Sequence, residues 1–286
     1  MYFGVDYYPE HWVFPFGGTA ENPEAQWQLD AELMAAAGFN IVRIAEFSWG
    51  LCETEDGKYN FDWIKRVMDV MGAHGIQVIL ATPTAAPPIW LTKKHPEILP
   101  IDEQGLTKHE GTRRAVCLNS EVYWSYSKRL VEKMARTLGE HPQLVAWQID
   151  NSLGGNFTEA AFNEDARRDW HLWLEAKYET IEKLNERMGL RHWSQIVSAW
   201  NQVPMPMRSP TQHNPALVLD WNRFCSDTSR APARDCAGWA RPSASAPGST
   251  RKQSDPSGAG PCGHSVCGWS HISLRARDAS RGARHH

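Results

Sequence analysis

Short apolar runs alternate with longer amphipathic segments through the first 150 residues of the chain. Four of these runs have the length and composition of buried strands, near residues 2–6, 39–44, 76–81 and 144–150. Segments with helical spacing lie between them, at residues 25–37, 61–74 and 120–139; the first two stop at Gly38 and Gly75, and the third ends at Gly139. This alternation predicts parallel strands joined by right-handed helical crossovers.

The two ends of the predicted strands are connected in different ways. Helices lead into strands through Gly38 and Gly75, whereas the segments that follow the strands are long and rich in proline, tryptophan and charge. This asymmetry is typical of a (β/α) barrel, in which function lies at the C-terminal ends of the strands. Beyond the fourth strand the pattern is helical, at 160–178, at 180–188 and again from Pro215, and we expect no fifth strand.

The composition of the chain changes abruptly near Ser229. Residues 229–286 contain one Ile, one Leu and one Val but no Phe, Tyr, Met or Glu, and they carry eight Arg and one Lys against three Asp. Such a segment buries too little apolar area to offset its ordering entropy. We therefore expect a partial barrel domain at 1–228 and a tail at 229–286 without a packed core, and we interpret the tail as out-of-frame translation of a GC-rich gene. A basic, disordered tail that binds nucleic acid is the alternative.

Charge and hydropathy restrict the partners and the location of the protein. The chain has 30 Lys and Arg against 33 Asp and Glu, so no overall basic field favours nucleic acid or an anionic membrane surface. No run approaches the ~18 apolar residues of a membrane span, and the chain begins at Met1 without the pattern of a signal peptide. We expect a cytoplasmic protein with a neutral ligand and no cofactor, in which the six Cys remain thiols.

Candidate chemistry is concentrated in four segments at or just past the predicted strand ends. Each combines aromatic rings with hydrogen-bonding side chains, and they lie at residues 5–12, 43–50, 82–91 and 147–152. Because the ends of parallel strands meet at one edge of a sheet, these segments predict a concave site for a neutral polyol. The alternative is a barrel rim of polar groups that satisfy one another. Some of the fourteen Trp would then stack on sugar rings, while most fill the core.

The motifs in these segments resemble those of glycoside hydrolase family 42, the microbial β-galactosidases. The likeness covers residues 1–228 and is carried by FGVDYYPEHW, VRIAEFSWG, ATPTAAPPIWLTKKHPEILP, GTRRAVCLNS and AWQIDN. It implies a (β/α)8 TIM barrel, of which this chain holds about the first four β/α units. It also implies hydrolysis of terminal β-D-galactosides with retention of configuration, by two carboxyl groups ~5–5.5 Å apart. Members of the family often form homo-oligomers.

The resemblance places a proton-donor Glu after the fourth strand and a nucleophilic Glu after the seventh. The family reads Asn-Glu at the first of these positions, and here Asn151 is followed by Ser152. A serine hydroxyl is far too weak an acid to protonate a glycosidic oxygen near neutral pH. The neighbouring Asp150 is expected to project to a different side from Ser152. The nucleophile would fall in the part of the family that the 229–286 tail replaces, so we expect this chain to be inactive.

Other positions of the resemblance concern substrate and metal. Arg114 matches the family's substrate-contacting Arg, with a surface ion pair to Glu110 as the alternative, and Asn151 matches an Asn that binds the sugar. Some members hold a structural zinc with four Cys, of which only Cys117 is kept here, while Ala160, Ala161, Asn163 and Ala166 occupy the stretch of the others. In the tail, the spacing of Cys262, His264, Cys267 and His271 matches no common zinc finger, so we expect no metal.

Three interpretations follow from these positions. The chain is a hydrolase of β-galactosides or related small carbohydrates, a weak carbohydrate-binding fragment without turnover, or a disrupted gene product that does neither well. Ser152 argues against the first, and the change in composition near Ser229 argues against the first two.

Overall fold

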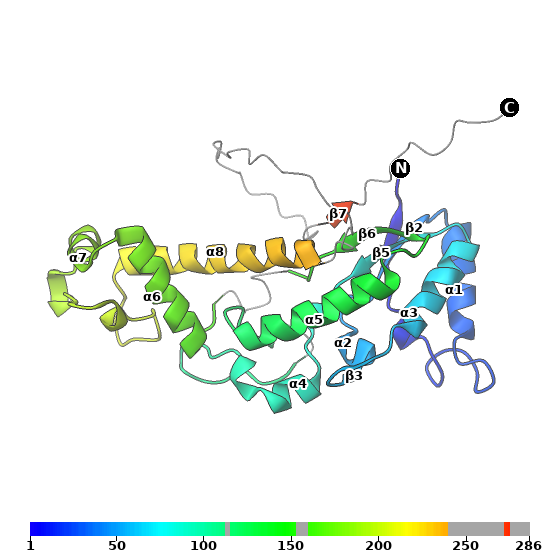
Figure 1. The fold of residues 1–286 in the computed structure, drawn as a ribbon, viewed down its shortest axis with the longest axis horizontal. Coiled ribbons are helices and arrows are strands. Elements are labelled where there is room, and N and C mark those ends of the chain that lie inside the picture. Colours follow the sequence, from blue (N-terminus) through cyan, green and yellow to red (C-terminus); the bar gives the residue numbers. More distant parts are fainter. Residues whose placement is uncertain (112–114, 153–159, 240–271, 275–286) are drawn as a thin grey trace, which may run out of the picture.

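The computed structural model describes residues 1–111, 115–152, 160–239 and 272–274, with the backbone alone described for 230–239 and 272–274. The molecule is elongated, with a sheet and its covering helices at one end and a helical extension at the other (Figure 1). None of the helices in these ranges combines the length and the apolar character needed to cross a membrane.

The main sheet has the strand order β1-β2-β5-β6-β7. Its parallel strands are β1 (Gly4–Asp6), β2 (Ile41–Ile44), β5 (Gln77–Ala81) and β6 (Leu144–Gln148), all within the four predicted runs. The prediction of no fifth strand is wrong, because β7 (Ile272–Leu274) pairs antiparallel with β6. A strand at a sheet edge exposes unpaired backbone groups. The single Ile and the single Leu of the tail are the first and last residues of β7, which pairs with these groups of β6. A separate hairpin, also not predicted, consists of β3 (Glu53–Glu55) and β4 (Lys58–Tyr59).

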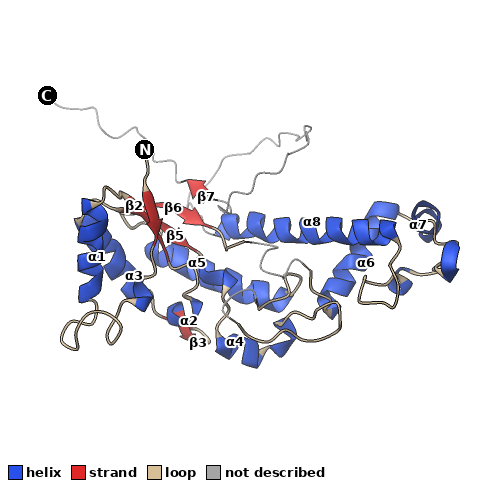
Figure 2. Cartoon of the chain, turned by 180° about the vertical axis from the view of Figure 1, so that it is seen from behind, coloured by secondary structure: helices blue, strands red, loops and turns tan. Residues whose placement is uncertain are grey.

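Helices cover one face of the sheet, as Figure 2 shows from behind. They are α1 (Ala25–Ala36), α3 (Asp62–Ala73) and α5 (Glu121–Leu138), with the shorter α2 (Trp49–Cys52) and α4 (Ile89–Lys94) beside the hairpin. In α3, Ile64, Val67 and Met71 recur at helical spacing and are fully buried against the sheet, which is why this amphipathic segment folds as a helix here. Short 3-10 turns lie at Pro9–His11, Pro83–Ala85, Pro96–Ile98, His192–Ser194 and Trp200–Gln202.

The glycines that follow the helices behave in two ways. Gly38 and Gly75 have positive φ angles of 83° and 72°, the left-handed conformation in which a side chain is unfavourable. They lie in the short helix-to-strand connections that the sequence predicts, with four residues between α1 and β2 and three between α3 and β5. Gly139 instead has a helical φ of −61°, so the end of α5 does not use glycine's conformational freedom.

The helical extension has a core of its own. It contains α6 (Glu164–Tyr178), α7 (Ile181–Met188) and α8 (Pro215–Trp239). Trp170, Trp221 and Phe224 form the centre of an aromatic cluster with ring centroids 5.1–5.6 Å apart among its closest pairs. The helix α8 passes through the expected domain boundary at residue 228, so the change in composition does not coincide with the end of an element. The boundary itself stays a prediction, since residues 240–271 and 275–286 of the tail lie outside the described residues.

Candidate active site

The four chemistry-bearing segments meet at the C-terminal ends of β1, β2, β5 and β6. Tyr8 follows β1 and donates a hydrogen bond to Glu46, which follows β2, at 2.8 Å. Gln148, the last residue of β6, reaches the other oxygen of Glu46 at 3.3 Å. Thr84 follows β5 and donates to Asp150 at 2.6 Å. The parallel register thus gathers residues separated by up to about a hundred positions at one edge of the sheet, as predicted.

Glu46 is the centre of this arrangement on the β1–β2 side. Its carboxylate is 2 % exposed and lies 2.9 Å from the guanidinium of Arg43, which also pairs with Asp6. Burial, followed by the hydrogen bond to Glu46, raises the pKa of Tyr8 to about 12. Tyr8 therefore stays protonated near neutral pH and acts as a hydrogen-bond donor. Its ring lies parallel to that of Phe47, with centroids 6.2 Å apart, which gives the edge an aromatic surface beside the carboxylate.

Asp150 is the buried carboxylate on the β5–β6 side of the site. It is 1 % exposed, its carboxylate accepts from Thr84, and its backbone N–H donates to the hydroxyl of Thr82 at 2.8 Å. Asp150 has a φ of 53° and Ser152 one of 46°, so the backbone leaves the extended conformation directly after β6. Backbone in this uncommon region is concentrated at functional sites, where neighbouring contacts fix it. Asp150 is buried and Ser152 is exposed, in agreement with the expectation that they project to different sides.

Ser152 and Asn151 form the outer part of the turn. The hydroxyl of Ser152 donates to the side-chain oxygen of Asn151 at 2.6 Å, and Asn151 is 9 % exposed. The structure therefore brings together two of the three predicted site residues. The third, Arg114, lies outside the described residues. Its alternative partner Glu110 forms an ion pair with Lys93 at 3.1 Å.

Several residues of the site were not singled out by the sequence. Glu46, Gln148, Thr82 and Thr84 lie within the quoted segments, but their partners depend on the register between strands, which no local pattern specifies. Glu10 was also missed. Burial raises the pKa of its carboxyl, and Oε2 of Glu10 has no hydrogen-bond partner among the described residues. A carboxyl within an aromatic segment beside a strand end was the signal that could have identified it.

The residues present do not fit a structural zinc. Cys117 is buried against Ala161 and Ala166, and burial raises the pKa of its thiol to about 12, so the metal-binding thiolate is disfavoured. Asn163 uses its amide on the backbone, donating to Leu99 O at 2.9 Å and accepting from Ile101 N at 2.9 Å. Within the ranges that the structure describes, no group of three or more His, Cys, Asp or Glu is arranged to hold a metal.

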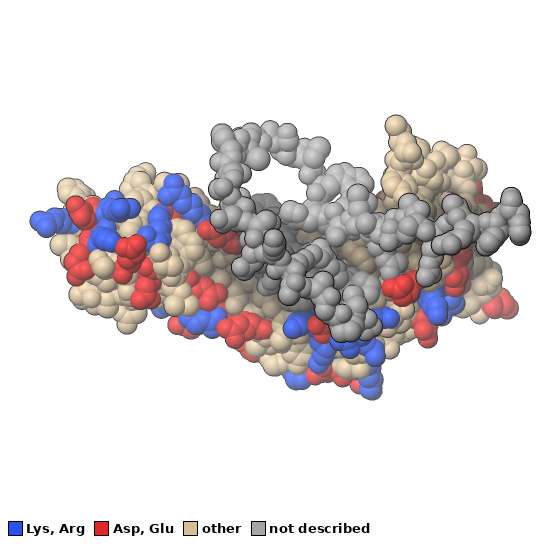
Figure 3. All heavy atoms as spheres, turned by 45° about the horizontal axis from the view of Figure 1, so that its top comes forward, with Lys and Arg blue, Asp and Glu red and all other residues tan. Residues whose placement is uncertain are grey.

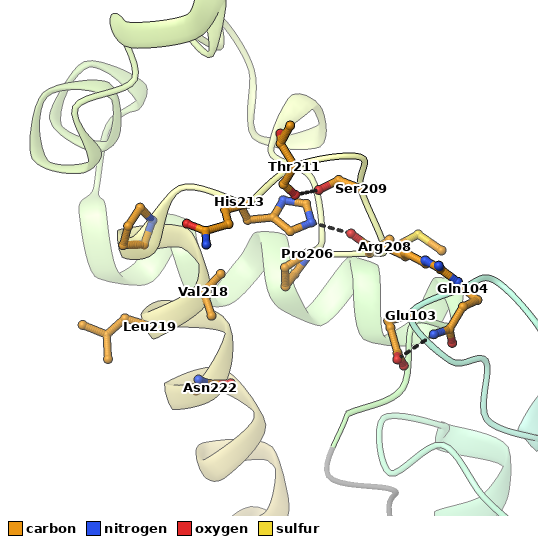
Figure 4. Close-up of a pocket in the computed structure, with 13 residues that line it drawn as sticks. Glu103, Gln104, Pro206, Arg208, Ser209, Thr211, His213, Val218, Leu219 and Asn222 are labelled. Atoms are coloured by element: carbon orange, nitrogen blue, oxygen red, sulfur yellow. Dashed lines mark hydrogen bonds between the residues drawn. The ribbon is translucent and has the colours of Figure 1, made fainter.

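A separate hollow of about 740 Å³ lies in the helical extension (Figure 4). The loop at Glu103 and Gln104 forms one side, and the first turns of α8 and the segment before it form the other, including Arg208 and His213. His213 contacts the carbonyl of Met207, and Gln104 donates to Glu103 at 2.8 Å. None of the residues at the strand ends lines this hollow, so it is not part of the candidate active site.

Similar solved structures define the fold class. Residues covering 84 % of this chain match 35 % of a β-galactosidase from the psychrophilic Marinomonas ef1, with a TM-score of 0.78 and 36 % identity. The catalytic domain of a β-amylase from Paenibacillus polymyxa matches 83 % of the chain with a TM-score of 0.56 at only 12 % identity, a likeness of fold alone. The parallel strands and their covering helices are therefore part of a TIM barrel, as predicted.

The chain belongs to glycoside hydrolase family 42, whose model, described as Beta-galactosidase, matches residues 6–237. A β-galactosidase from Thermus thermophilus is 39 % identical over 228 residues, which are 80 % of this chain and 34 % of that protein. A β-galactosidase from an Arthrobacter species is 40 % identical over 224 residues, 78 % of this chain and 31 % of that protein. The chain thus spans about a third of the length of the relatives that it matches.

Proposed function

We propose that this chain is the front part of a retaining β-galactosidase barrel that has lost its proton donor and does not hydrolyse β-galactosides. The observation that carries the proposal is the chemistry of the turn after β6. The position that follows Asn151 is exposed at the strand ends and holds the hydroxyl of Ser152, not a carboxyl group. A retaining mechanism needs a carboxylic acid here, first to protonate the leaving oxygen and then to activate water.

The neighbouring carboxyl does not replace the missing acid in this proposal. Asp150 is buried and engaged by Thr84, and its backbone is fixed by Thr82. A proton donor must come within hydrogen-bond distance of the glycosidic oxygen, which requires an open path from the carboxyl to the substrate. Glu46 is likewise committed to Tyr8, Arg43 and Gln148. Both carboxylates therefore support the site and do not react in it.

The test is an assay of the purified chain with an aryl β-galactoside, in material produced in a host without β-galactosidase. We expect no release of the aryl alcohol above the uncatalysed rate. Ser152→Glu restores one carboxyl of the required pair, and we expect this single change to leave the chain inactive, because residues 229–286 contain no Glu that replaces the nucleophile. Turnover by the unaltered chain that follows the protein through purification would refute the proposal.

Weak carbohydrate binding without turnover is the second candidate. It is supported by Asn151 at the exposed turn and by the adjacent Tyr8 and Phe47 rings, since an aromatic face with nearby hydrogen-bonding groups suits a sugar. Saturation-transfer NMR with galactose distinguishes it from the disrupted protein. Binding that is weakened by Asn151→Ala, but not by Asn201→Ala in the helical extension, would support this candidate. Absence of any transfer would remove it.

A further inference from the structure

A single amide side chain lies where the segment after β5 meets the start of the helical extension. Asn163 is 6 % exposed, and its Nδ2 donates to the carbonyl oxygens of Glu97 at 3.1 Å and Leu99 at 2.9 Å. Its Oδ1 accepts from the backbone N–H of Ile101 at 2.9 Å. An amide side chain has two N–H donors and one oxygen acceptor, so both kinds of polar group in Asn163 are engaged with residues 97–101.

The position of Asn163 in the chain shows that this contact replaces a more local one. It is the residue directly before α6, where an asparagine ordinarily accepts a hydrogen bond from the first turn of its own helix. Ser120 and Thr180 cap α5 and α7 in this way. Among the described residues the side chain of Asn163 makes no such cap bond. It therefore holds a distant segment and does not begin its own helix.

Backbone hydrogen bonds extend the same junction. Phe162 N donates to Ile101 O at 2.8 Å, and Cys117 N donates to Ile98 O at 2.7 Å. The side chains of Phe162 and Ile101 both pack in the core of the helical extension. Residues 97–101 are thus bonded to the segment before α5 and to the segment before α6 at once.

This junction is also the place at which the family resemblance implies a zinc ion held by four cysteines. Such an ion joins separate segments of a chain through thiolates. Here Ala161 and Ala166 pack with Cys117 in a small buried cluster, so methyl groups lie beside the one remaining thiol. Asn163, in the same stretch, joins the backbone segment to which Cys117 is also bonded.

The ion pair that joins the two regions lies at the surface. Arg168 of α6 pairs with Glu121 of α5 at 3.2 Å, but the two side chains are 45 % and 83 % exposed. Figure 3 shows basic and acidic side chains intermingled over the helical extension, at the left of the view. Exposed pairs contribute little to stability, whereas the loss of a buried hydrogen-bonding group leaves its partners unsatisfied. The buried amide is therefore the stronger of these two connections.

We propose that Asn163 is a metal-free clamp, which fastens the helical extension to the α/β region by hydrogen bonds in place of a zinc cross-link. The clamp is a positioning device, because it holds residues 97–101 of the segment after β5 against the start of α6. It does not depend on the proposed loss of catalysis, since neither Asn151 nor Ser152 takes part in it.

The first test is thermal unfolding of the full chain with the amide removed. Asn163→Ala leaves one N–H and two carbonyl groups of residues 97–101 without their partner and should lower the melting temperature on the order of 5 °C or more. Asn201→Ala is the matched control, because Asn201 is exposed, and it should have little effect. The amide of Ile101 should exchange its hydrogen faster in Asn163→Ala but not in the control.

A second variant keeps the shape of the side chain and changes its hydrogen bonding alone. In Asn163→Asp an ionised carboxylate cannot donate, and it faces the carbonyl oxygens of Glu97 and Leu99. Protonation of the carboxyl restores one donor. The loss of melting temperature in Asn163→Asp should therefore be smaller at about pH 4 than at about pH 7. The loss in Asn163→Ala should be the same at both.

The comparison with a metal site is tested with a zinc chelator. We expect the unaltered chain to melt at the same temperature with the chelator and without it. A melting temperature that falls on chelation in the unaltered chain, but not in Cys117→Ala, would place a metal at this junction and overturn the proposal. Equal melting of Asn163→Ala and Asn201→Ala would overturn it as well, and so would a loss in Asn163→Asp that does not change with pH.

Discussion

The α/β region, residues 1–151, and the helical extension, residues 160–229, have aromatic and aliphatic cores of similar character but differ in their buried polar groups. In the α/β region buried polar side chains include Glu46, Thr84 and Asp150, most of them near strand ends. In the helical extension only Asn163 and Asp220 are buried among the described polar side chains. Burying a polar group requires a hydrogen-bond partner in a fixed place. The buried polar side chains of the described residues are therefore concentrated where the parallel strands end, and the extension contains few of them.

The most severe test of this comparison replaces one buried tryptophan in each region. Trp49 and Trp170 are both 0 % exposed, so Trp49→Ala and Trp170→Ala should each lower the free energy of unfolding by about 3–5 kcal/mol. We expect both to shift one common transition in differential scanning calorimetry, because the regions are linked through Phe162 N to Ile101 O at 2.8 Å and through Asn163. Two separate transitions, each sensitive to one variant, would show that the regions unfold independently.

The buried carboxylate of the extension gives a smaller effect. Asp220 is 2 % exposed, accepts from Tyr178 at 2.6 Å and pairs with Lys177 and Arg223. Asp220→Ala removes these charge-assisted bonds and should cost about 1.5–3 kcal/mol in urea unfolding. Asp227→Ala on the same helix is the control, because Asp227 is exposed and bonds only Trp173 among the described residues. Equal effects of the two variants would contradict the assignment of Asp220 as a buried anchor.

The corresponding substitution at the strand ends removes one uncharged hydrogen-bond donor, the hydroxyl of Thr84. Thr84→Val keeps the shape of the side chain but removes the hydrogen bond to Asp150, and should cost about 1–3 kcal/mol because the carboxylate remains buried. Chemical unfolding of this variant is compared with that of Thr137→Val, at an exposed position of α5. We also expect the amide of Asp150 to exchange faster in Thr84→Val alone. Unchanged stability and exchange would mean that Asp150 is not held through Thr84.

The smallest effect is a change in the pH dependence of stability. Burial raises the pKa of Glu10 in the folded chain above its unfolded value of about 4.3, so the folded state binds more protons and stability falls as pH rises from that value through the folded pKa. Glu10→Gln replaces the titrating carboxyl with a neutral amide and so removes this loss of stability at higher pH. Its melting temperature relative to the unaltered chain should therefore be higher at pH 7 than at pH 4. Glu186→Gln, at an exposed position of α7, should show no such difference.

Much of the fold followed from local pattern, and the exceptions have physical reasons. The four parallel strands and the helices between them were predictable because their apolar spacing is regular. The β3–β4 hairpin was missed although Asp56-Gly57 is a common turn signal, because its strands have only three and two residues. The strand β7 was missed because it belongs to a segment with almost no other apolar residues. Its pairing also requires the open edge of β6, which the local sequence of the tail does not reveal.

The sequence predicted where the site lies, at the C-terminal ends of the strands, but it did not predict which residues of the site contact one another. Segment ends identified the edge of the sheet at which Asn151 and Ser152 lie, since parallel strands end together. The hydrogen bond from Gln148 to Glu46 joins residues 102 positions apart, and it exists because β2, β5 and β6 pair in one particular register. A shift of one residue in either pairing would turn these side chains to the opposite face. The roles of Asn151, Ser152 and Arg114 stay predictions.

The antiparallel strand β7 also has a topological consequence. A strand can hydrogen-bond only one neighbour along each edge, and β7 occupies residues Ala146 to Gln148 of β6. A barrel that continued beyond β6 would place its next parallel strand along those same residues. The two pairings exclude each other, so β7 acts as a competitive terminator of sheet growth. In a polypeptide that carried both β7 and the next parallel barrel strand, only one of the two could pair with β6. The sheet would then either end at β6 or continue around the barrel.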